Sequence, residues 1–279
     1  MSGSRRLAGV MGWPVAHSRS PALHRFWLNQ YKIDGDYRAL AVAPDQLPTA
    51  LHALAGKGFA GCNLTVPLKE AAVGLMDRLD PTARRIGAVN TVVVGPDDEL
   101  EGLNSDGFGF IENLRACRPD FDFKRGPVVV LGAGGAARAI LDALRQAGSP
   151  EIRLANRSDS HAQELAAALG ATVSIVSWQK RASALKGATL LVNTTSLGMA
   201  GQPPLDLDLA ALPTTALVND IVYAPLETAL LKNAKARGNP TVDGLGMLLH
   251  QGRLGFSRWF GIMPEVTPEL REAVLVDEP

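Results

Sequence analysis

Cysteine is nearly absent from this sequence. The 279 residues include only Cys62 and Cys117, which lie far apart and form no C-x-x-C spacing. So few thiols indicate a reducing compartment, and they provide neither a cysteine metal site nor a dithiol redox motif. The five histidines likewise show no H-x-x-x-H spacing, so no bound metal is expected.

The sequence also lacks a long hydrophobic run and an excess of charge of either sign. None of its apolar stretches approaches the length of a membrane span, and the apolar run within residues 1–14 is too short for the core of a signal peptide. Its 28 basic residues balance its 28 acidic residues, which argues against nucleic acid or an anionic membrane as the main partner. These features predict a cytoplasmic protein.

Strand-like and helix-like stretches alternate along the first hundred residues. A hydrophobic fraction of 46% over 279 residues is enough for one large or two ordinary domains. Residues 20–31 are predicted as a helix, with Ser20 as the N-cap and Pro21 at the first helical position. Short strands are predicted at residues 7–12, 36–42, 58–66 and 88–94. This alternation predicts an α/β fold with a mostly parallel sheet.

A second unit is predicted after the segment 117–127. It opens with a buried strand at residues 127–131 and a glycine-rich turn that leads into a helix over residues 132–148. The alternation then continues, with strands at 151–158, 188–199 and 214–225 and helices at 160–170 and 226–238. Two last helices are predicted near 246–260 and 267–277.

The glycine-rich turn has the pattern of a dinucleotide site. The segment VVVLGAGGAAR places Gly132, Gly134 and Ala137 at the three positions of the G-x-G-x-x-G/A motif. Gly132 permits the tight turn, Gly134 lets backbone approach a pyrophosphate, and Ala137 keeps the helix close to the strand. Free N–H groups at the start of the helix would bind the phosphates. The predicted cofactor residues of this turn are Gly132, Ala133, Gly134, Gly135 and Ala136.

The end of the next strand indicates which dinucleotide binds. An NAD site commonly has Asp or Glu there, but this strand ends in Asn156, Arg157 and Ser158. A carboxylate would repel a 2′-phosphate, whereas a guanidinium binds one through a charge-assisted pair, and Asn and Ser can donate further hydrogen bonds. The sequence therefore predicts NADP as the cofactor.

Two polar features of the first unit are candidates for a substrate site. Ser18 and Ser20 precede a predicted helix, where hydroxyls and helix N–H groups can hold a carboxylate, although serines there also serve as ordinary caps. In GCNLTVPLKEAA, residues 61–72, a strand is predicted to run into a helix that starts with Lys69 near its first turn. Because a helix N-terminus disfavours a cation, Lys69 is either a functional group or a solvated charge offset by Glu70.

Seven motifs, in their order along the chain, resemble the shikimate dehydrogenase family. They cover nearly the whole chain and are GWPVAHSRSP, NLTVPLKE, GAVNT, LNSDGFG, GAGGAAR, NRS and VDGLGMLLHQ. The resemblance implies an oxidoreductase that reversibly reduces 3-dehydroshikimate to shikimate with NADPH, in chorismate and aromatic amino acid biosynthesis. It implies a small-molecule substrate, no nucleic acid or membrane partner, and a monomer or homodimer.

The resemblance also implies how the chain is divided and which residues act. Residues 1–105 and 240–279 would form a substrate domain, to which the C-terminal helices return, and residues 106–239 a Rossmann domain. The substrate carboxylate would be held by Ser18, Ser20 and Thr65, and the ring hydroxyls would be surrounded by Lys69, Asn90, Asp106 and Gln251. Tyr223 would lie near the substrate and Gly244 against the nicotinamide.

Lys69 and Asp106 are the predicted acid/base pair. Oxidation of an alcohol requires a base for the hydroxyl proton, and the reverse reaction requires an acid. A helix N-terminus and partial burial would both disfavour the ammonium form of Lys69, whereas the neighbouring carboxylate of Asp106 would stabilise it. The two groups are expected to titrate as a unit.

Departures from the family pattern leave two alternatives open. NSDG stands in place of the commoner N-T-D-G, with Asp106 retained, and His161 stands where many NADP-dependent members have a second basic residue. One alternative is a quinate or dual quinate/shikimate dehydrogenase, which a single hydroxyl near residues 18, 20 or 65 would decide. The other is a non-catalytic NADP-binding regulator, which would have no need for the polar set around Lys69.

Overall fold

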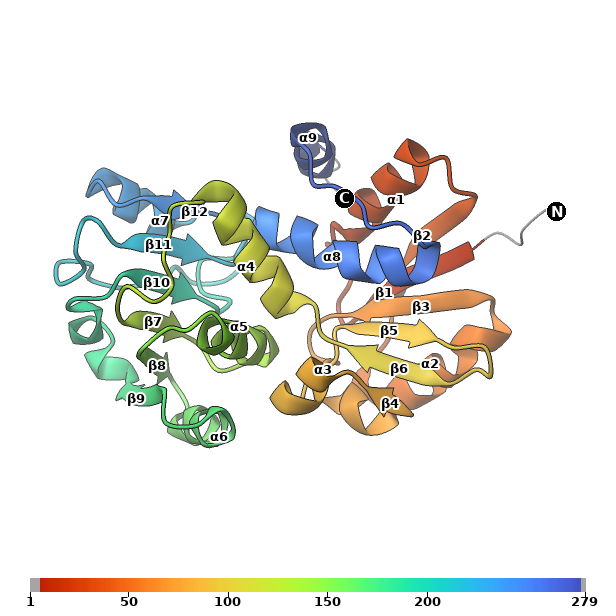
Figure 1. Cartoon of the computed structure of the whole chain (residues 1–279), viewed down its shortest axis with the longest axis horizontal. Coiled ribbons are helices and arrows are strands. Elements are labelled where there is room, and N and C mark those ends of the chain that lie inside the picture. Colours follow the sequence, from red (N-terminus) through yellow and green to blue (C-terminus); the bar gives the residue numbers. More distant parts are fainter. Residues whose placement is uncertain (1–5, 277–279) are drawn as a thin grey trace. The chain divides into compact units, whose positions relative to one another are not determined.

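The computed structural model describes residues 6–276, which form two compact units. The first unit contains the chain up to Gly109 together with the chain from Leu248 on, and the second contains Phe110–Met247. The divisions fall inside helices α4 (Asp106–Cys117) and α8 (Leu245–Phe260). The domain limits suggested by the sequence, after residues 105 and 239, lie a few residues before these divisions. Each of the two helices contributes residues to both units. Figure 1 shows the elements with their labels.

The first unit is built on a six-stranded mixed sheet in the order β2-β1-β3-β5-β6-β4. β1 pairs in parallel with β2 and β3, and β4 pairs in parallel with β6, whereas β5 runs antiparallel to both of its neighbours. The prediction of a two-domain α/β fold with parallel-rich sheets is confirmed. The strand bounds are β1 Arg6–Gly12, β2 Gly35–Ala41, β3 Phe59–Leu64, β4 Arg78–Leu79, β5 Thr91–Val94 and β6 Leu100–Leu103.

Helices cover both faces of this sheet. Leu47, Leu51 and Leu54 of α2 are buried with apolar residues of β1 and β3 on one face. On the other face, the Trp259 indole of α8 donates to the Val92 carbonyl of β5 at 3.0 Å. The helix bounds in this unit are α1 Ser20–Gln30, α2 Leu47–Gly56, α3 Pro81–Ile86 and α9 Pro268–Val276, with short 3-10 helices η1 Pro44–Gln46 and η2 Ala71–Leu75. Residue 277, the predicted end of the last helix, lies outside the described residues.

Two details of the predicted helices are wrong. Ser20 is the first residue of α1 and Arg19 is its N-cap, while the Ser18 hydroxyl accepts a hydrogen bond from the Ser20 N–H at 3.3 Å. Lys69 does not begin an α-helix but lies in a turn before η2. Its carbonyl accepts from the Val89 N–H at 2.8 Å, so it is used by another segment and not by a helical turn.

The second unit contains a six-stranded sheet in which every pair is parallel. Its order, β9-β8-β7-β10-β11-β12, is 3-2-1-4-5-6 counted from β7, which is the order of a dinucleotide-binding Rossmann fold. The strand order reverses between β7 and β10, where such sheets bind their ligands. The strand bounds are β7 Val128–Leu131, β8 Ile152–Asn156, β9 Val173–Ser177, β10 Leu190–Asn193, β11 Leu217–Asp220 and β12 Thr241–Val242.

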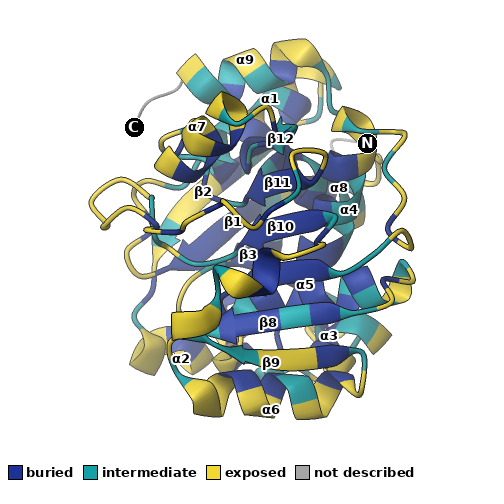
Figure 2. Ribbon diagram, turned by 90° about the vertical axis from the view of Figure 1, so that its left-hand side faces the viewer, coloured by how far each residue is buried: buried dark blue, intermediate teal, exposed yellow. Residues whose placement is uncertain are grey.

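The central strand of this sheet is buried on both faces, as a parallel sheet between helices requires. Val128 and Val130 of β7 lie in one core, and Val129 and Leu131 lie in the other. In Figure 2 the strands β8, β10 and β11 are mostly buried, whereas the edge strand β9 and the outer side of α6 carry exposed residues. The helices are α5 Gly135–Gln146, α6 Asp159–Leu169 and α7 Ala229–Ala236, with η3 Trp178–Lys180 and η4 Ser183–Leu185.

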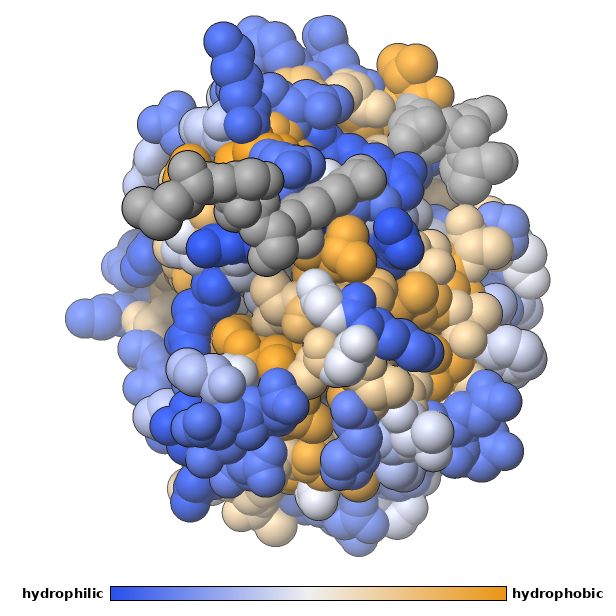
Figure 3. All heavy atoms as spheres, turned by 90° about the vertical axis from the view of Figure 1, so that its right-hand side faces the viewer, coloured by the Kyte–Doolittle hydropathy of each residue, from blue (hydrophilic) through white to orange (hydrophobic). Residues whose placement is uncertain are grey.

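The face drawn in Figure 3 carries hydrophilic side chains with smaller hydrophobic patches between them. Apolar atoms contribute more than half of the surface of an ordinary folded protein, so such patches alone indicate no partner. Over residues 6–276, no helix combines the length and the hydropathy that crossing a bilayer requires.

Candidate active site

Lys69 and Asp106 form a shielded ion pair in the first unit. The Lys69 Nζ lies 2.5 Å from Asp106 Oδ2, and the side chains are only 16% and 7% exposed. Asp106 is the first residue of α4, and its N–H donates to Asn104 Oδ1 at 3.0 Å, which fixes the start of that helix. Because the pair is largely removed from water, the attraction between its charges is stronger than at a surface.

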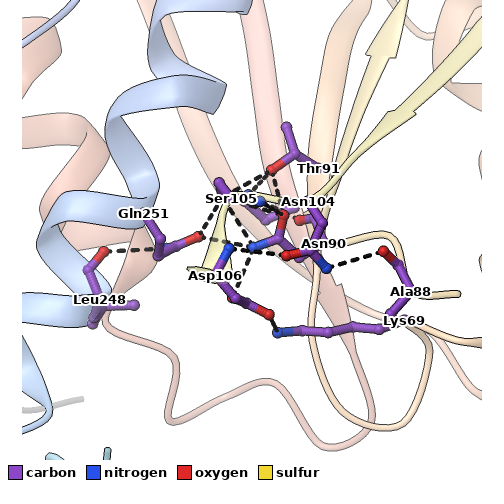
Figure 4. A network of polar contacts seen from close by, with 10 residues as sticks. Lys69, Ala88, Asn90, Thr91, Asn104, Ser105, Asp106, Leu248 and Gln251 are labelled. Carbon is purple, nitrogen blue, oxygen red and sulfur yellow. Dashed lines mark hydrogen bonds and ion pairs between the residues drawn. The ribbon is translucent and has the colours of Figure 1, made fainter. Parts of the chain in front are cut away.

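The Asn90 carboxamide holds the other oxygen of that carboxylate. Its Nδ2 donates to Asp106 Oδ1 at 2.8 Å, while its Oδ1 accepts from the Ser105 N–H at 2.8 Å and from the Thr91 hydroxyl at 2.9 Å. Asn90 precedes β5 and is 2% exposed. The donors around Oδ1 therefore turn the amino side of the carboxamide toward Asp106 (Figure 4).

Gln251 reaches the same network from α8, although it lies far away in the sequence. Its Oε1 accepts from Asn90 Nδ2 and from the Ser105 hydroxyl, both at 3.3 Å, and its Nε2 donates to the Leu248 carbonyl at 3.1 Å. The structure thus brings together four of the predicted site residues, Lys69, Asn90, Asp106 and Gln251 (Figure 4).

The three predicted carboxylate ligands follow the adjacent strands β1 and β3 along the chain, and Ser20 begins α1. Thr65 directly follows β3, and its N–H donates to the Met11 carbonyl of β1 at 2.9 Å. Ser18 and Ser20 follow β1, and the Ser18 hydroxyl is joined to the Ser20 N–H. Ser20 is buried, whereas Ser18 and Thr65 are partly exposed. Ser18 and Ser20 are thus joined to each other, while the Thr65 backbone is joined to β1.

Sequence reasoning missed several members of the network. Asn104 and Ser105 lie inside the motif LNSDGFG, so attention to every polar residue of that motif would have found them. Thr91, Asn63 and Tyr37 carry no such signal, because each reads as an ordinary strand residue. All five are buried.

In the second unit, Gly132 and Gly134 of the turn after β7 differ in whether the protein's own packing requires glycine. Gly132 has φ of +107°, its N–H donates to the Ala155 carbonyl at 2.9 Å, and a Cβ there would lie 2.6 Å from Thr194 Oγ1. Gly134 caps α5 with φ of −87°, and a Cβ there would meet no atom within 4 Å. The chain's own packing therefore requires Gly132 but not Gly134. Open space before a helix N-terminus fits a pyrophosphate.

The end of β8 lies at the same edge of the sheet as the glycine turn. Arg157 is exposed, Asn156 Nδ2 donates to the Ser158 carbonyl at 2.9 Å, and the Ser158 and Ser160 hydroxyls lie 2.9 Å apart. Parallel pairing of β7 with β8 places Leu131 beside Ala155, so the glycine turn and this strand end leave the same edge of the sheet. A guanidinium and hydroxyls beside a phosphate-binding turn suit the 2′-phosphate of NADP.

Asp220 at the end of β11 is a buried carboxylate among neutral partners. It accepts from Asn193 Nδ2 at 3.0 Å, from the Val222 N–H at 3.1 Å and from the Thr228 hydroxyl at 2.7 Å. Burial raises the pKa of Asp220 to about 6, against the opposing effect of these hydrogen bonds. The residue ties the segment that carries Tyr223 to the end of β10 and to the start of α7.

Gly244 lies in the turn between β12 and α8. A Cβ at this position would collide with the Ile221 and Val222 carbonyls, so the close approach of two backbone segments requires glycine here. Within the described part of the chain, no three His, Cys, Asp or Glu side chains are grouped so that they could hold a metal ion.

Three family models match the chain. Residues 10–92 match the shikimate dehydrogenase substrate binding domain, residues 116–199 match shikimate / quinate 5-dehydrogenase, and residues 244–275 match the shikimate 5'-dehydrogenase C-terminal domain. Among curated proteins, the shikimate dehydrogenase (NADP(+)) of Paramagnetospirillum magneticum is 63% identical over 275 residues, which are 99% of this chain and 100% of that protein.

Solved structures give the same result. The shikimate 5-dehydrogenase of Thermus thermophilus, in complex with NADP(H) and shikimate, is 41% identical with a TM-score of 0.86, over 98% of this chain and 99% of that one. The quinate dehydrogenase of Corynebacterium glutamicum, in complex with NAD, is 33% identical with a TM-score of 0.89, over 98% of this chain and 99% of that one.

Proposed function

This chain belongs to the shikimate dehydrogenase family, and we propose that it reversibly reduces 3-dehydroshikimate to shikimate with NADPH, in chorismate and aromatic amino acid biosynthesis. The observation that carries this proposal is the network of the partly buried Lys69 with the buried Asn90, Asp106 and Gln251. An ion pair with two carboxamides beside it offers a proton-transfer group and several donors and acceptors for hydroxyl groups. A protein that only bound NADP would gain nothing from such a set.

NADP, when bound, supplies the hydride acceptor or donor, and the chain supplies the rest of the chemistry. The glycine turn, Gly132, Ala133, Gly134, Gly135 and Ala136, would hold the pyrophosphate. The strand end, Asn156, Arg157 and Ser158, would hold the 2′-phosphate. Supporting observations are the open space over Gly134 and the exposed guanidinium of Arg157. Gly244 would lie against the nicotinamide and Tyr223 near the substrate, as the family resemblance implies.

Lys69 is the proposed acid/base group. In oxidation Lys69 Nζ takes the proton of the reacting hydroxyl, and in reduction it returns that proton to the carbonyl oxygen. Asp106 keeps the amine in place through its Oδ2. The short distance between Lys69 Nζ and Asp106 Oδ2 and the low exposure of both side chains support this assignment. Lys69 lies in a turn, so no helix dipole acts on its amine.

Ser18, Ser20 and Thr65 are the proposed ligands of the substrate carboxylate. Thr65 follows β3 and the two serines follow the adjacent strand β1 along the chain. A hydrogen bond from a hydroxyl to a charged group stabilises binding by about 1.5–3 kcal/mol. Asn90 and Gln251 would bind the ring hydroxyls. We further propose a cytoplasmic location, which suits the small number of cysteines, and a monomer or homodimer, which light scattering after size exclusion would decide.

A quinate dehydrogenase is the second candidate, since a quinate dehydrogenase is among the most similar folds. Quinate carries one more hydroxyl at the carbon that bears the carboxylate, so the residues around that carboxylate would have to accommodate it.

The proposal is tested by absorbance at 340 nm with chelator-treated protein. Shikimate with NADP should produce NADPH between neutral and alkaline pH, and 3-dehydroshikimate should consume it. Absence of both signals from folded protein would overturn the proposal. Faster turnover of quinate would transfer the assignment to the second candidate.

A further inference from the structure

A chain of hydrogen bonds runs through the first unit behind the ion pair. The Tyr37 hydroxyl of β2 donates to Asn63 Oδ1 of β3 at 2.7 Å, and Asn63 Nδ2 donates to Thr91 Oγ1 at 3.1 Å. Thr91 Oγ1 donates to Asn90 Oδ1 at 2.9 Å, and Asn90 Nδ2 donates to Asp106 Oδ1 at 2.8 Å. All five residues are buried, with at most 5% of each whole residue exposed.

Each link in this chain fixes the direction of the next. A phenol has one proton, and Tyr37 gives it to the oxygen of Asn63, so the amino group of Asn63 faces Thr91. Because Thr91 Oγ1 already accepts that bond, its single proton is directed to the oxygen of Asn90. The amino group of Asn90 is then the edge that faces Asp106.

The orientation of the Asn90 carboxamide matters because its two ends are nearly identical in shape and opposite in polarity. If the carboxamide turned over, its oxygen would face the carboxylate and Asp106 would lose a donor. A hydrogen bond to a charged group is worth about 10- to 150-fold in an equilibrium constant. The Ser105 N–H also donates to Asn90 Oδ1, at 2.8 Å. The Ser105 hydroxyl lies 3.2 Å from the same oxygen and 3.3 Å from Gln251 Oε1, so its single proton can serve only one of them, whereas the Thr91 hydroxyl makes the shorter contact with Asn90 Oδ1 at 2.9 Å.

The same chain extends toward the proposed carboxylate ligands. Burial raises the pKa of Tyr37 well above its ordinary value, and a hydrogen bond with the Ser20 side chain opposes part of that rise. Tyr37 thus has Ser20 near its hydroxyl as well as Asn63. Asn63 also donates to the Asn90 carbonyl at 3.0 Å, so its polar atoms are used within the protein.

We infer that Thr91, Asn63 and Tyr37 are positioning residues for the reaction: they hold the Asn90 carboxamide with its amino group toward Asp106 and so keep Asp106 aligned with Lys69. None of the three is assigned contact with substrate. This inference rests on the proposed role of the Lys69–Asp106 pair. A purely structural network would stabilise the fold in the same way, but its loss would change thermal stability without changing turnover.

The test compares Thr91→Val, Thr91→Ser and Tyr37→Phe, with Tyr31→Phe as the matched control. Tyr31 is also in the first unit, but its hydroxyl accepts from the Glu265 N–H and lies outside the chain of hydrogen bonds. Thr91→Val, which keeps the shape and removes the hydroxyl, should lower kcat for shikimate about tenfold or more. KM for NADP should stay within about twofold. Thr91→Ser should keep most of the wild-type kcat. The kcat of Tyr37→Phe should lie between those of Thr91→Val and wild type, and Tyr31→Phe should match wild type.

A second readout does not depend on turnover. The side-chain carboxamide signal of Asn90 in ¹H–¹⁵N spectra should move in Thr91→Val and stay in place in Tyr31→Phe. An unchanged Asn90 signal, or a Thr91→Val enzyme with wild-type kcat and only a lower melting temperature, would overturn the inference while leaving the proposed function intact. A wild-type protein without shikimate turnover would refute the proposed function instead, and the Asn90 signal would still decide whether Thr91 orients the carboxamide.

Discussion

At the scale of single residues, the role proposed for Lys69 depends on its contact with Asp106 and not on a position at the start of a helix. Lys69→Ala removes the amine that lies 2.5 Å from Asp106. We expect kcat for shikimate to fall by roughly 10²–10⁴-fold, which is the usual contribution of a positioned acid/base group. The dissociation constant for NADP, measured by fluorescence titration, should change little.

Lys57→Ala is the matched control for that substitution. Lys57 is an exposed lysine that follows α2, and its loss should leave kcat unchanged. A Lys69→Ala enzyme that kept more than about half of the wild-type kcat would return Lys69 to the role of a simple charge, because such a loss is far below the acid/base range.

Arg157 is the residue that we propose to carry the preference for NADP over NAD. A charge-assisted pair with the 2′-phosphate is worth about 1.5–3 kcal/mol, or about 10- to 150-fold in kcat/KM. Arg157→Ala should therefore remove most of the preference by weakening NADP and leaving NAD almost unchanged, whereas Arg125→Ala, at another exposed arginine, should do neither. Equal losses with both cofactors would show that Arg157 does not bind the phosphate.

His24 makes the fold sensitive to acid. It is fully buried and stacks on the Tyr37 ring at 4.0 Å, and burial lowers its pKa from 6.5 to about 3. An unfolded chain takes up a proton here below about pH 6.5, whereas the folded chain does not until about pH 3. Stability from this residue is thus present above about pH 6.5 and is lost on acidification, by up to about 1.4 kcal/mol per pH unit.

His24→Phe tests that prediction, because it keeps a ring and removes the titrating group. Urea unfolding at pH 7.5, 6.0 and 5.0 should show a smaller fall in the free energy of unfolding for the variant than for wild type. Identical falls in the two proteins would mean that other groups cause the acid sensitivity.

At the scale of elements, the strand–turn–helix from β7 to α5 separates a structural glycine from a binding glycine. Gly134→Val places a side chain in open space at an ordinary φ, so the melting temperature should change little while the KM for NADP rises strongly. Gly132→Ala combines a positive φ with a contact at Thr194, so it should lower the melting temperature itself. If both variants lost stability equally and Gly134→Val bound NADP normally, the turn would not be the pyrophosphate site.

Local sequence predicted the helices of the second unit better than those of the first, although the strands β9 and β12 were not expected. A parallel sheet buried on both faces gives apolar runs such as VVVL that alternate with helices, and this pattern is visible without tertiary information. In the first unit, β5 joins antiparallel and β6 was not expected, because strand direction depends on how distant segments pair. The helix expected at Lys69 fails for the same reason, since the Lys69 carbonyl bonds to Val89.

At the scale of the whole molecule, the proposed substrate residues are collected from distant parts of the chain. Lys69, Asn90 and Asp106 come from the first 109 residues and Gln251 from the returning helix α8. No local pattern predicts that return, so only the family resemblance suggested Gln251. Asn63 and Tyr37 could not be identified at all from sequence, because their importance depends on hydrogen bonds that cross three strands.

We expect this enzyme to oxidise shikimate with NADP in preference to the other pairs of substrate and cofactor. The most direct test is kcat/KM for the four pairs of shikimate or quinate with NADP or NAD, measured on one chelator-treated preparation. Shikimate with NADP should give the highest value, about 10- to 150-fold above shikimate with NAD, as the charge-assisted pair at Arg157 predicts. A higher kcat/KM for quinate, equal kcat/KM with NAD and NADP, or no reduction of NADP by shikimate would contradict the assignment as an NADP-dependent shikimate dehydrogenase.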